Sequence, residues 1–309
     1  MFASLLTTTP DYRHIVFTDT LHGARHAVNL APDLGRRRPR RSNVLGEQDW
    51  HFIRWLFARA GLNASDYREQ TLARRLPACL RALRVESIDS ARSAVEQQPA
   101  LLQAAIDAML IGVTSFFRDR SVFIHLREAV LPALLGRRRT IRVWSAGCSD
   151  GAELYSIAIL LSEMGALGRA HLLGTDSRPG ALRDASGGWF ADQAIHGIPR
   201  ELLPRYFVPD PSGDRWRAAP SLRFAARWRS TDVLYGGECS PAAWDLILCR
   251  NLAMYLRPDA AARLWDRLAG AIAPGGFLVL GKAERPARVG LTCVYPCIFR
   301  REPEVSDDA

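Results

Sequence analysis

The spacing of hydrophobic residues divides the chain into two regions. Between residues 49 and 113, apolar positions recur every three or four residues, which is typical of amphipathic helices. From residue 140 onward, short apolar runs alternate with helical segments. Buried strands separated by helices favour a mostly parallel sheet that is covered on both faces. We therefore expect an all-α N-terminal domain followed by an α/β domain with a Rossmann-like sheet.

The helical region is expected to form helices over 49–62, 65–83, 88–98 and 99–113. The second of these has Ser65 as its expected N-cap, and Pro77 is expected to bend or interrupt it. Its apolar face consists of Leu72, Leu76, Cys79, Leu80 and Leu83. Its other side carries a row of arginines, namely Arg68, Arg74, Arg75, Arg81 and Arg84.

The second region predicts strands at 140–146, 170–176, 244–249 and 275–281, and helices at 151–165, 179–186 and 258–273. The pattern breaks between residues 187 and 229, where Pro, Trp and Arg are frequent. We expect an inserted antiparallel β-subdomain there, with short strands near 206–208, 215–218 and 222–226.

These patterns suggest a division into four parts. Residues 1–45 form an irregular extension, and 46–118 form a helical domain with its linker. Residues 119–303 form the α/β domain, in which 187–229 are the insertion, and 304–309 form a short tail.

Charge adds little to this description. The chain has 309 residues and a net charge of +9, but of its 41 basic residues only Lys282 is a lysine. This excess of arginine over lysine is more typical of a GC-rich coding bias than of a nucleic-acid-binding surface. The densest run, at 36–41, contains a proline and is interpreted as a solvated linker.

Cysteine usage and hydropathy bear on the compartment. Six cysteines are scattered without metal-ligand spacing, which indicates reduced thiols and predicts no metal site. No apolar run approaches the roughly 20 residues that span a bilayer, and the N-terminus lacks the pattern of a secretory signal. A cytoplasmic location without membrane insertion is expected.

The stretch "SAGCSDGAELYS" at 145–156 is the first candidate for chemistry. Gly147 and Gly151 let the backbone approach a ligand at the carboxyl end of a strand. The stretch matches neither the phosphate loop nor the Gly-x-Gly-x-x-Gly pattern. Asp176 ends the next strand, where it can accept hydrogen bonds from both ribose hydroxyls or cap the following helix. Together these features suit an adenosine ligand without phosphate, such as S-adenosylmethionine (SAM), whose amino or hydroxyl groups Glu153 could meet.

Several motifs, taken in order, resemble the CheR family of chemotaxis-receptor glutamate O-methyltransferases. They are "TSFFRD", "VWSAGCSDGAELYSIA", "GTD", "LPRYF", "WDLILCRNLAMYL" and "PGGFLVLGKAE". The helical segment "GLNASDYREQTLARRLPACLRAL" also resembles the N-terminal domain of that family. The resemblance covers roughly residues 47–300. It implies a class I SAM-dependent methyltransferase fold, with S-adenosylhomocysteine (SAH) as the product and no metal.

The resemblance also implies roles for individual residues. Those implied to contact the cofactor are Thr114, Arg118, Gly147, Gly151, Glu153, Asp176, Asp232, Val233, Arg250 and Asn251. Asp232 and Val233 would line the adenine, and Tyr255 would face the methyl group. Arg118 could instead pair with an acid between the domains, and Tyr255 could belong to the core.

The implied reaction forms a methyl ester on a glutamate side chain. A glutamate carboxylate is ionised at neutral pH, with a reference pKa of about 4.3, so no general base is needed. The hypothesis is that Arg118 orients this carboxylate while Tyr255 shapes the methyl pocket. Positioning of this kind supplies roughly 7–11 kcal/mol of barrier lowering.

The implied partner is a helix of a methyl-accepting chemotaxis receptor. The arginines of segment 68–84 are either its docking face or a solvated surface. The proline- and charge-rich segment 208–218 favours recognition that does not depend on a receptor tail. The chain is expected to be a monomer, recruited to membrane receptor arrays through its acceptor.

Departures from the family pattern leave two rival hypotheses. Ala152 and Leu154 replace a usual Glu and Pro, and Gly112 replaces a frequent Asn. Asp232 also replaces an Asn. The segment "TDSR" lacks a second acid, and "GKAER" stands in place of "GHSE". One rival is a SAM-binding regulator that has lost turnover. The other is nucleic-acid methylation, which lacks support because "RNLAMY" stands where an Asp/Asn-Pro-Pro-aromatic signature is expected.

Overall fold

The computed structural model describes residues 45–302 except 111, 113, 212 and 287–289. Its N-terminal part is helical, as expected. The elements are α1 (Glu47–Arg59), the 3-10 turn η1 (Ala64–Asp66), α2 (Glu69–Ala82), α3 (Ile88–Gln97) and α4 (Leu101–Met109). The predicted apolar face of α2, from Leu72 to Leu83, is buried in a core shared by these helices. We call this part the helical unit.

One prediction about α2 is wrong, and for Pro77 the structure excludes an interruption of the helix. Ser65 lies within η1, where its backbone N–H donates to the Asn63 side chain at 3.1 Å, and α2 begins only at Glu69. Pro77 does not interrupt α2, which continues to Ala82. Proline removes one helical hydrogen bond, but Leu76 and Leu80 on either side of it are buried in the core and hold the helix together.

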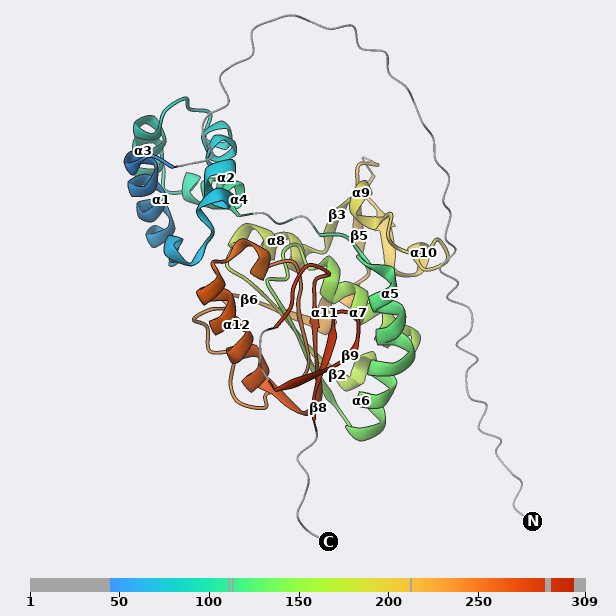
Figure 1. Ribbon diagram of the computed structural model, residues 1–309. Coiled ribbons are helices and arrows are strands. Elements are labelled where there is room, and N and C mark those ends of the chain that lie inside the picture. The colour runs from blue at the N-terminus through green and yellow to red at the C-terminus, as the bar shows by residue number, and fades with distance from the viewer. Residues whose placement is uncertain (1–44, 111, 113, 212, 287–289, 303–309) are drawn as a thin grey trace, which may run out of the picture.

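The second part is built on a seven-stranded sheet in the order β6-β2-β1-β7-β8-β10-β9 (Figure 1). Its parallel strands are β1 (Ile141–Ala146), β2 (Ala170–Asp176), β6 (Ala226–Ser230), β7 (Trp244–Cys249) and β8 (Ile272–Leu280). The antiparallel strands β9 (Leu291–Tyr295) and β10 (Ile298–Arg301) complete it. The predicted Rossmann-like, mostly parallel sheet is confirmed.

Helices cover both faces of this sheet. They are α5 (Arg120–His125), the π-helical turn η2 (Leu126–Val130), α6 (Leu131–Arg137), α7 (Ala152–Glu163), α8 (Pro179–Gly187) and α12 (Pro258–Ala271), and the 3-10 turns η3 (Leu167–Arg169) and η4 (Ala253–Tyr255) join strands. Helix α7 is buried over nearly its whole length because β1, β2, β6 and helix α11 (Pro220–Ala225) of the inserted segment surround it. Within the described ranges, no helix is both long and apolar enough to cross a bilayer.

The inserted segment forms a separate three-stranded antiparallel sheet in the order β3-β5-β4. Its elements are β3 (Trp189–Ala191), α9 (Asp192–Ile195), α10 (Leu203–Tyr206), β4 (Phe207–Pro209), β5 (Arg215–Ala218) and α11 (Pro220–Ala225). The strand expected at 222–226 is wrong. Pro220 starts a helix there, as proline favours the first helical turn, and the chain then joins the main sheet as β6.

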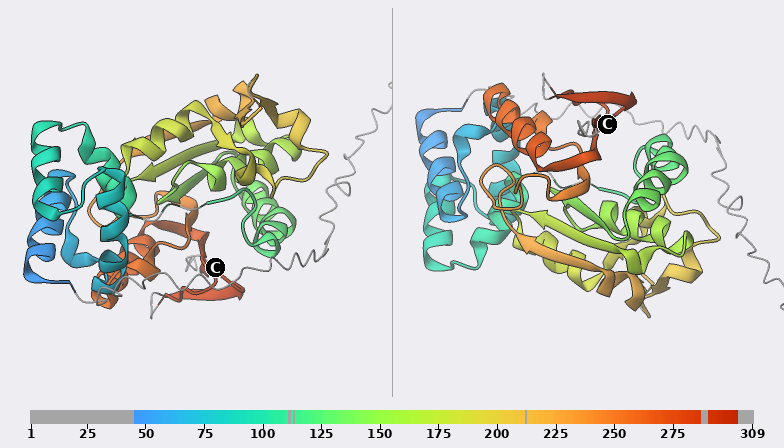
Figure 2. Two further views of the ribbon diagram at one scale, coloured as in Figure 1. Left: turned by 90° about the horizontal axis from the view of Figure 1, so that it is seen from above. Right: turned by 90° about the horizontal axis from the view of Figure 1, so that it is seen from below.

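The helical unit packs against one end of the sheet, next to α8 and α12 (Figures 1 and 2). Tyr67 pairs with Leu256 in an isolated antiparallel bridge, and the Arg68 backbone N–H donates to the Tyr255 carbonyl at 2.9 Å. The buried Asp66 carboxylate accepts hydrogen bonds at 2.6 Å from both Arg263 and the Tyr235 hydroxyl. The helical unit is therefore fixed to the sheet by backbone and charged contacts.

Candidate active site

A pocket lies at the carboxyl ends of β1, β2 and β7, under the helical unit. Its walls include the predicted site residues Thr114, Arg118, Gly147, Glu153, Asp176, Asp232, Val233, Arg250, Asn251 and Tyr255. The helical unit contributes Tyr67, Thr71, Leu72, Met109 and Leu110. Positions far apart in the sequence thus converge on one cavity, as ligand sites of open parallel sheets do.

The glycine turn serves two purposes. Gly147 has a φ of +73°, and a Cβ there would lie 2.4 Å from Leu252, so only glycine fits on the pocket wall. Gly151, with a φ of +86°, does not line the pocket. A Cβ at Gly151 would lie 2.6 Å from the Trp228 ring, which indicates a packing role at the start of α7.

Asp176 at the tip of β2 is buried and already heavily hydrogen-bonded. Its Oδ2 accepts from the Ser149 backbone N–H at 2.8 Å and from Arg178 Nη2 at 3.2 Å. Its Oδ1 accepts from the Arg178 backbone N–H at 2.9 Å and from Arg178 Nε at 3.0 Å. The sequence predicted the position of Asp176 in the pocket, but not its ion pair with Arg178.

Glu153 and Arg250 belong to a buried charge network. Glu153 accepts from Ser145 Oγ at 2.7 Å and from Arg250 Nη1 at 3.3 Å. Arg250 Nη2 donates at 2.7 Å to both the Asp119 carboxylate and the Arg118 carbonyl. Arg250 therefore links the start of α7 to the turn that carries Arg118.

Asp119 was not predicted as a site residue, although it follows Arg118 in the motif "TSFFRD". Burial opposes ionisation of Asp119, but the hydrogen bond from Lys282 at 2.8 Å and the charge of Arg250 outweigh it and hold its pKa below the usual value. Phe117 and Asp119 have φ values of +49° and +62°, so the turn around Arg118 is strained. Strain of this kind persists where surrounding contacts enforce it, commonly at functional sites.

The opposite end of the pocket carries an acid and a tyrosine. Asp232 Oδ1 accepts from the Leu234 N–H at 2.9 Å, whereas its buried Oδ2 has no hydrogen-bond partner among the described residues. Burial raises the pKa of Asp232, and burial together with the charges of Asp232 and Asp176 raises the pKa of Tyr67 well above its usual value. An unpartnered acceptor in a pocket wall suits a ligand amine, such as the exocyclic amine of adenine.

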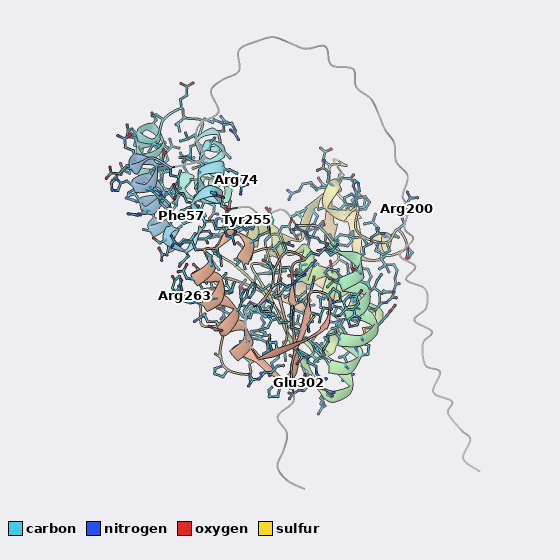
Figure 3. The ribbon with its side chains drawn as sticks, viewed as in Figure 1. Phe57, Arg74, Arg200, Tyr255, Arg263 and Glu302 are labelled. Atoms are coloured by element: carbon cyan, nitrogen blue, oxygen red, sulfur yellow. The ribbon has the colours of Figure 1, made fainter. Side chains whose placement is uncertain are left out.

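The end of β7 is held by Glu284, which is 3% exposed. Its carboxylate accepts from the backbone N–H groups of Asn251 and Gly281, both at 2.8 Å. Asn251 has a φ of +59°, and Tyr255 lies at the junction with the helical unit (Figure 3). Glu284 thus fixes the turn that presents Asn251 and leads to Tyr255.

The predicted docking arginines have different surroundings. Arg68 donates from Nε to the Leu256 carbonyl at 2.8 Å, so it belongs to the contact between the two parts. Arg75 is half-buried and donates to the Ala108 carbonyl at 2.8 Å. Arg74, Arg81 and Arg84 are exposed on or just after α2, which leaves these three available to an acidic partner.

Replacing Tyr67 with alanine is expected to weaken SAH binding about tenfold, because the ring closes the Asp232 end of the pocket and base–aromatic contacts contribute roughly 1–3 kcal/mol. Isothermal titration calorimetry measures the change. Trp55→Ala truncates an aromatic ring of the helical unit that lies outside the pocket, and it should leave SAH affinity unchanged. Equal affinities for Tyr67→Ala and wild type would remove Tyr67 from the binding site.

Asp150, beside the pocket, predicts a pH effect on stability. Burial raises its pKa from 3.8 to about 6. The folded chain then binds this proton more tightly than the unfolded chain, so the associated stabilisation is present below pH 3.8 and is lost as the pH rises through about 6. Asp150→Asn can still accept the hydrogen bond from the Ala152 N–H. We expect this variant to be more stable than wild type at pH 7 in urea unfolding, with the gain shrinking toward pH 4; a constant difference would contradict the assignment.

A Rossmann-like sheet with a glycine turn and strand-tip acids on one pocket defines the class of SAM-dependent methyltransferases. The family comparison agrees. The model of the CheR methyltransferase SAM-binding domain matches residues 112–290, and that of the CheR methyltransferase all-alpha domain matches residues 51–110. The chain therefore belongs to the CheR methyltransferase family. The unpartnered Asp232 oxygen fits the adenine amine of SAM.

Relatives cover the same region. The chain is 30% identical over 235 residues to an uncharacterized 104.1 kDa protein of Rhodobacter capsulatus, covering 74% of this chain but only 24% of that longer protein. It is 29% identical over 250 residues to a chemotaxis protein methyltransferase of Listeria monocytogenes, covering 79% of this chain and 94% of the relative. Chemotaxis protein methyltransferase 2 of Pseudomonas aeruginosa is 29% identical over 257 residues, covering 79% and 91%.

Proposed function

We propose that this chain methylates glutamate side-chain carboxylates of chemotaxis-type receptors and forms glutamate methyl esters. The carrying observation is that Arg118 and Tyr255 line the same pocket as the acids Glu153 and Asp176. The Listeria and Pseudomonas relatives, which are covered to 94% and 91%, are named chemotaxis protein methyltransferases, and this supports the chemotaxis assignment.

Bound SAM supplies an electrophilic methyl group on a sulfonium. The protein's task is to hold an acceptor oxygen in line with it and to keep water out. The Arg118 guanidinium orients the carboxylate, while Arg250 fixes the Arg118 backbone. Tyr255 borders the methyl position. Because the acceptor is already ionised, no side chain has to remove a proton.

We propose that the acceptor helix binds to the helical unit and its linker, residues 46–118. SAM is held by residues 119–303, which include the insertion at 187–229. Arg74, Arg81 and Arg84 are the proposed acidic-helix contacts, because they are exposed on the helical unit. We further propose that the chain acts as a cytoplasmic monomer that reaches membrane receptor arrays through this contact.

A second candidate is a SAM-binding regulator without turnover. The departures from the family pattern favour it, such as Gly112 in place of a frequent Asn and Asp232 in place of Asn. The test supplies tritiated SAM and the cytoplasmic fragment of a methyl-accepting receptor, and then counts base-labile label. Labelled ester supports the proposed enzyme. SAH binding in calorimetry without any ester would favour the regulator and overturn the proposed reaction.

A further inference from the structure

The hydrogen bonds of Asp176 leave no acceptor position for a ribose. An ionised carboxylate offers about four lone-pair sites. The Ser149 and Arg178 backbone N–H groups fill two of them, and Nε and Nη2 of Arg178 fill the others. The side chain of Arg178 therefore occupies the positions that two ribose hydroxyls would need.

The Arg178 guanidinium fits in its place because Gly112, next to it, has no side chain. A Cβ added at Gly112 would lie 1.9 Å from Arg178 Nη1 and 2.4 Å from its Cζ. The guanidinium reaches the pocket because residue 112 has no side chain. The Ser149 hydroxyl donates to the Gly112 carbonyl at 3.1 Å, which holds the glycine against the same turn.

A second acid is available to Arg178. The Asp107 carboxylate, on α4 of the helical unit, lies against the start of α8, because a Cβ added at Gly180 would be 2.7 Å from its Oδ2. Burial lowers the pKa of Arg178, but the charges of Asp176 and Asp107 outweigh it and raise that pKa. Asp107 accepts a hydrogen bond from Gln103 at 2.9 Å, which leaves it capacity for further donors. A guanidinium released from Asp176 would find a counter-charge there.

We propose that Arg178 is an internal competitor of the cofactor, which occupies the Asp176 carboxylate and must turn away, toward Asp107, before the ribose binds. Arg178 and Gly112 thereby set the affinity for SAM and SAH. This inference rests on the proposed role of Asp176 as the ribose acid. It predicts that removing a charged residue from the pocket tightens binding, the reverse of what a supporting ligand residue would do.

The test measures SAH dissociation constants by calorimetry, without acceptor protein. Arg178→Ala is expected to bind SAH about tenfold more tightly than wild type. Gly112→Ala should expel the same guanidinium by steric conflict and also tighten binding, by about three- to tenfold. Asp107→Asn should weaken binding about threefold in the wild-type background and have no effect in the Arg178→Ala background.

Two controls match these changes. Arg200→Ala removes an exposed arginine of the inserted segment, and Gly136→Ala adds a methyl group where nothing lies within 4 Å. Both should bind SAH as the wild type does. If Arg178→Ala is folded by circular dichroism but binds SAH no more tightly than wild type, the proposal is overturned. Weaker binding would show that Arg178 instead positions the Asp176 carboxylate for the ligand. Absence of SAH binding by every variant and by wild type would instead refute the proposed function.

Discussion

Replacing Arg250 with methionine is expected to lower the free energy of unfolding by about 3–5 kcal/mol and to abolish SAH binding. The Arg250 side chain is 3% exposed and lies between the carboxylates of Asp119 and Glu153. Methionine fills much of the same volume but leaves Glu153 without its cation and Asp119 with Lys282 alone. Breaking a buried ion pair from one side costs about this much, because the remaining charge stays desolvated. Urea unfolding and calorimetry measure the two effects.

The control for Arg250 is Arg92→Met. Arg92 pairs with Glu96 on the surface of α3, where the two side chains are 51% and 44% exposed. Exposed pairs contribute about 0–1 kcal/mol, so this variant should unfold almost as the wild type does. A loss below 1 kcal/mol for Arg250→Met would show that the network is not needed for folding. Adding Glu153→Gln to the variant should recover part of the stability, since the uncompensated charge is then removed.

Arg118→Ala is expected to reduce methyl transfer about 100-fold. Misplacing a reacting group by about 1 Å can reduce turnover about 100-fold. The contacts that fix this residue come from Arg250 and involve its backbone carbonyl, so they survive the truncation. Tyr255→Phe keeps the ring that borders the pocket, so it should reduce the rate of methyl transfer by about tenfold at most. Transfer of tritiated methyl to a receptor fragment measures both effects.

Arg137→Ala, at the exposed end of α6, provides the comparison for Arg118 because it removes the same charge away from the pocket. Near-wild-type transfer by both Arg118→Ala and Tyr255→Phe would remove these residues from the mechanism. A folded Arg118→Ala variant that binds SAH but transfers no methyl group to the acceptor would support the proposed role.

Much of the sheet could be predicted because its signal is local. The strand at 170–176 has the predicted bounds, and Asp176 ends it as expected. The pocket was predictable for the same reason: parallel strands bring their carboxyl ends to one edge, so strand-tip residues meet there. Gly151 is the exception, because its conformation starts a helix while its missing side chain makes room for Trp228.

What could not be predicted depends on contacts between distant segments. Tyr67 enters the pocket only because its backbone bridges to Leu256, which lies 189 positions later in the chain. The role of Asp119 depends on Arg250 and Lys282, and nothing in the local pattern pairs them. At 222–226 the residue types fit a strand, but Pro220 at the first helical turn decides for a helix. At 222–226 the start of a helix overrides the strand propensity of the residues. For Tyr67 and Asp119, tertiary contacts decide the role of the residue.

The single lysine of the chain has a practical consequence. Lys282 is 67% exposed and its ammonium lies 2.8 Å from Asp119, next to the turn of Arg118. An amine-reactive fluorophore at high pH therefore has one side-chain target in the whole protein, besides the chain terminus. Such a label would lie next to the turn that carries Arg118, with no engineered cysteine and no mutation of the protein.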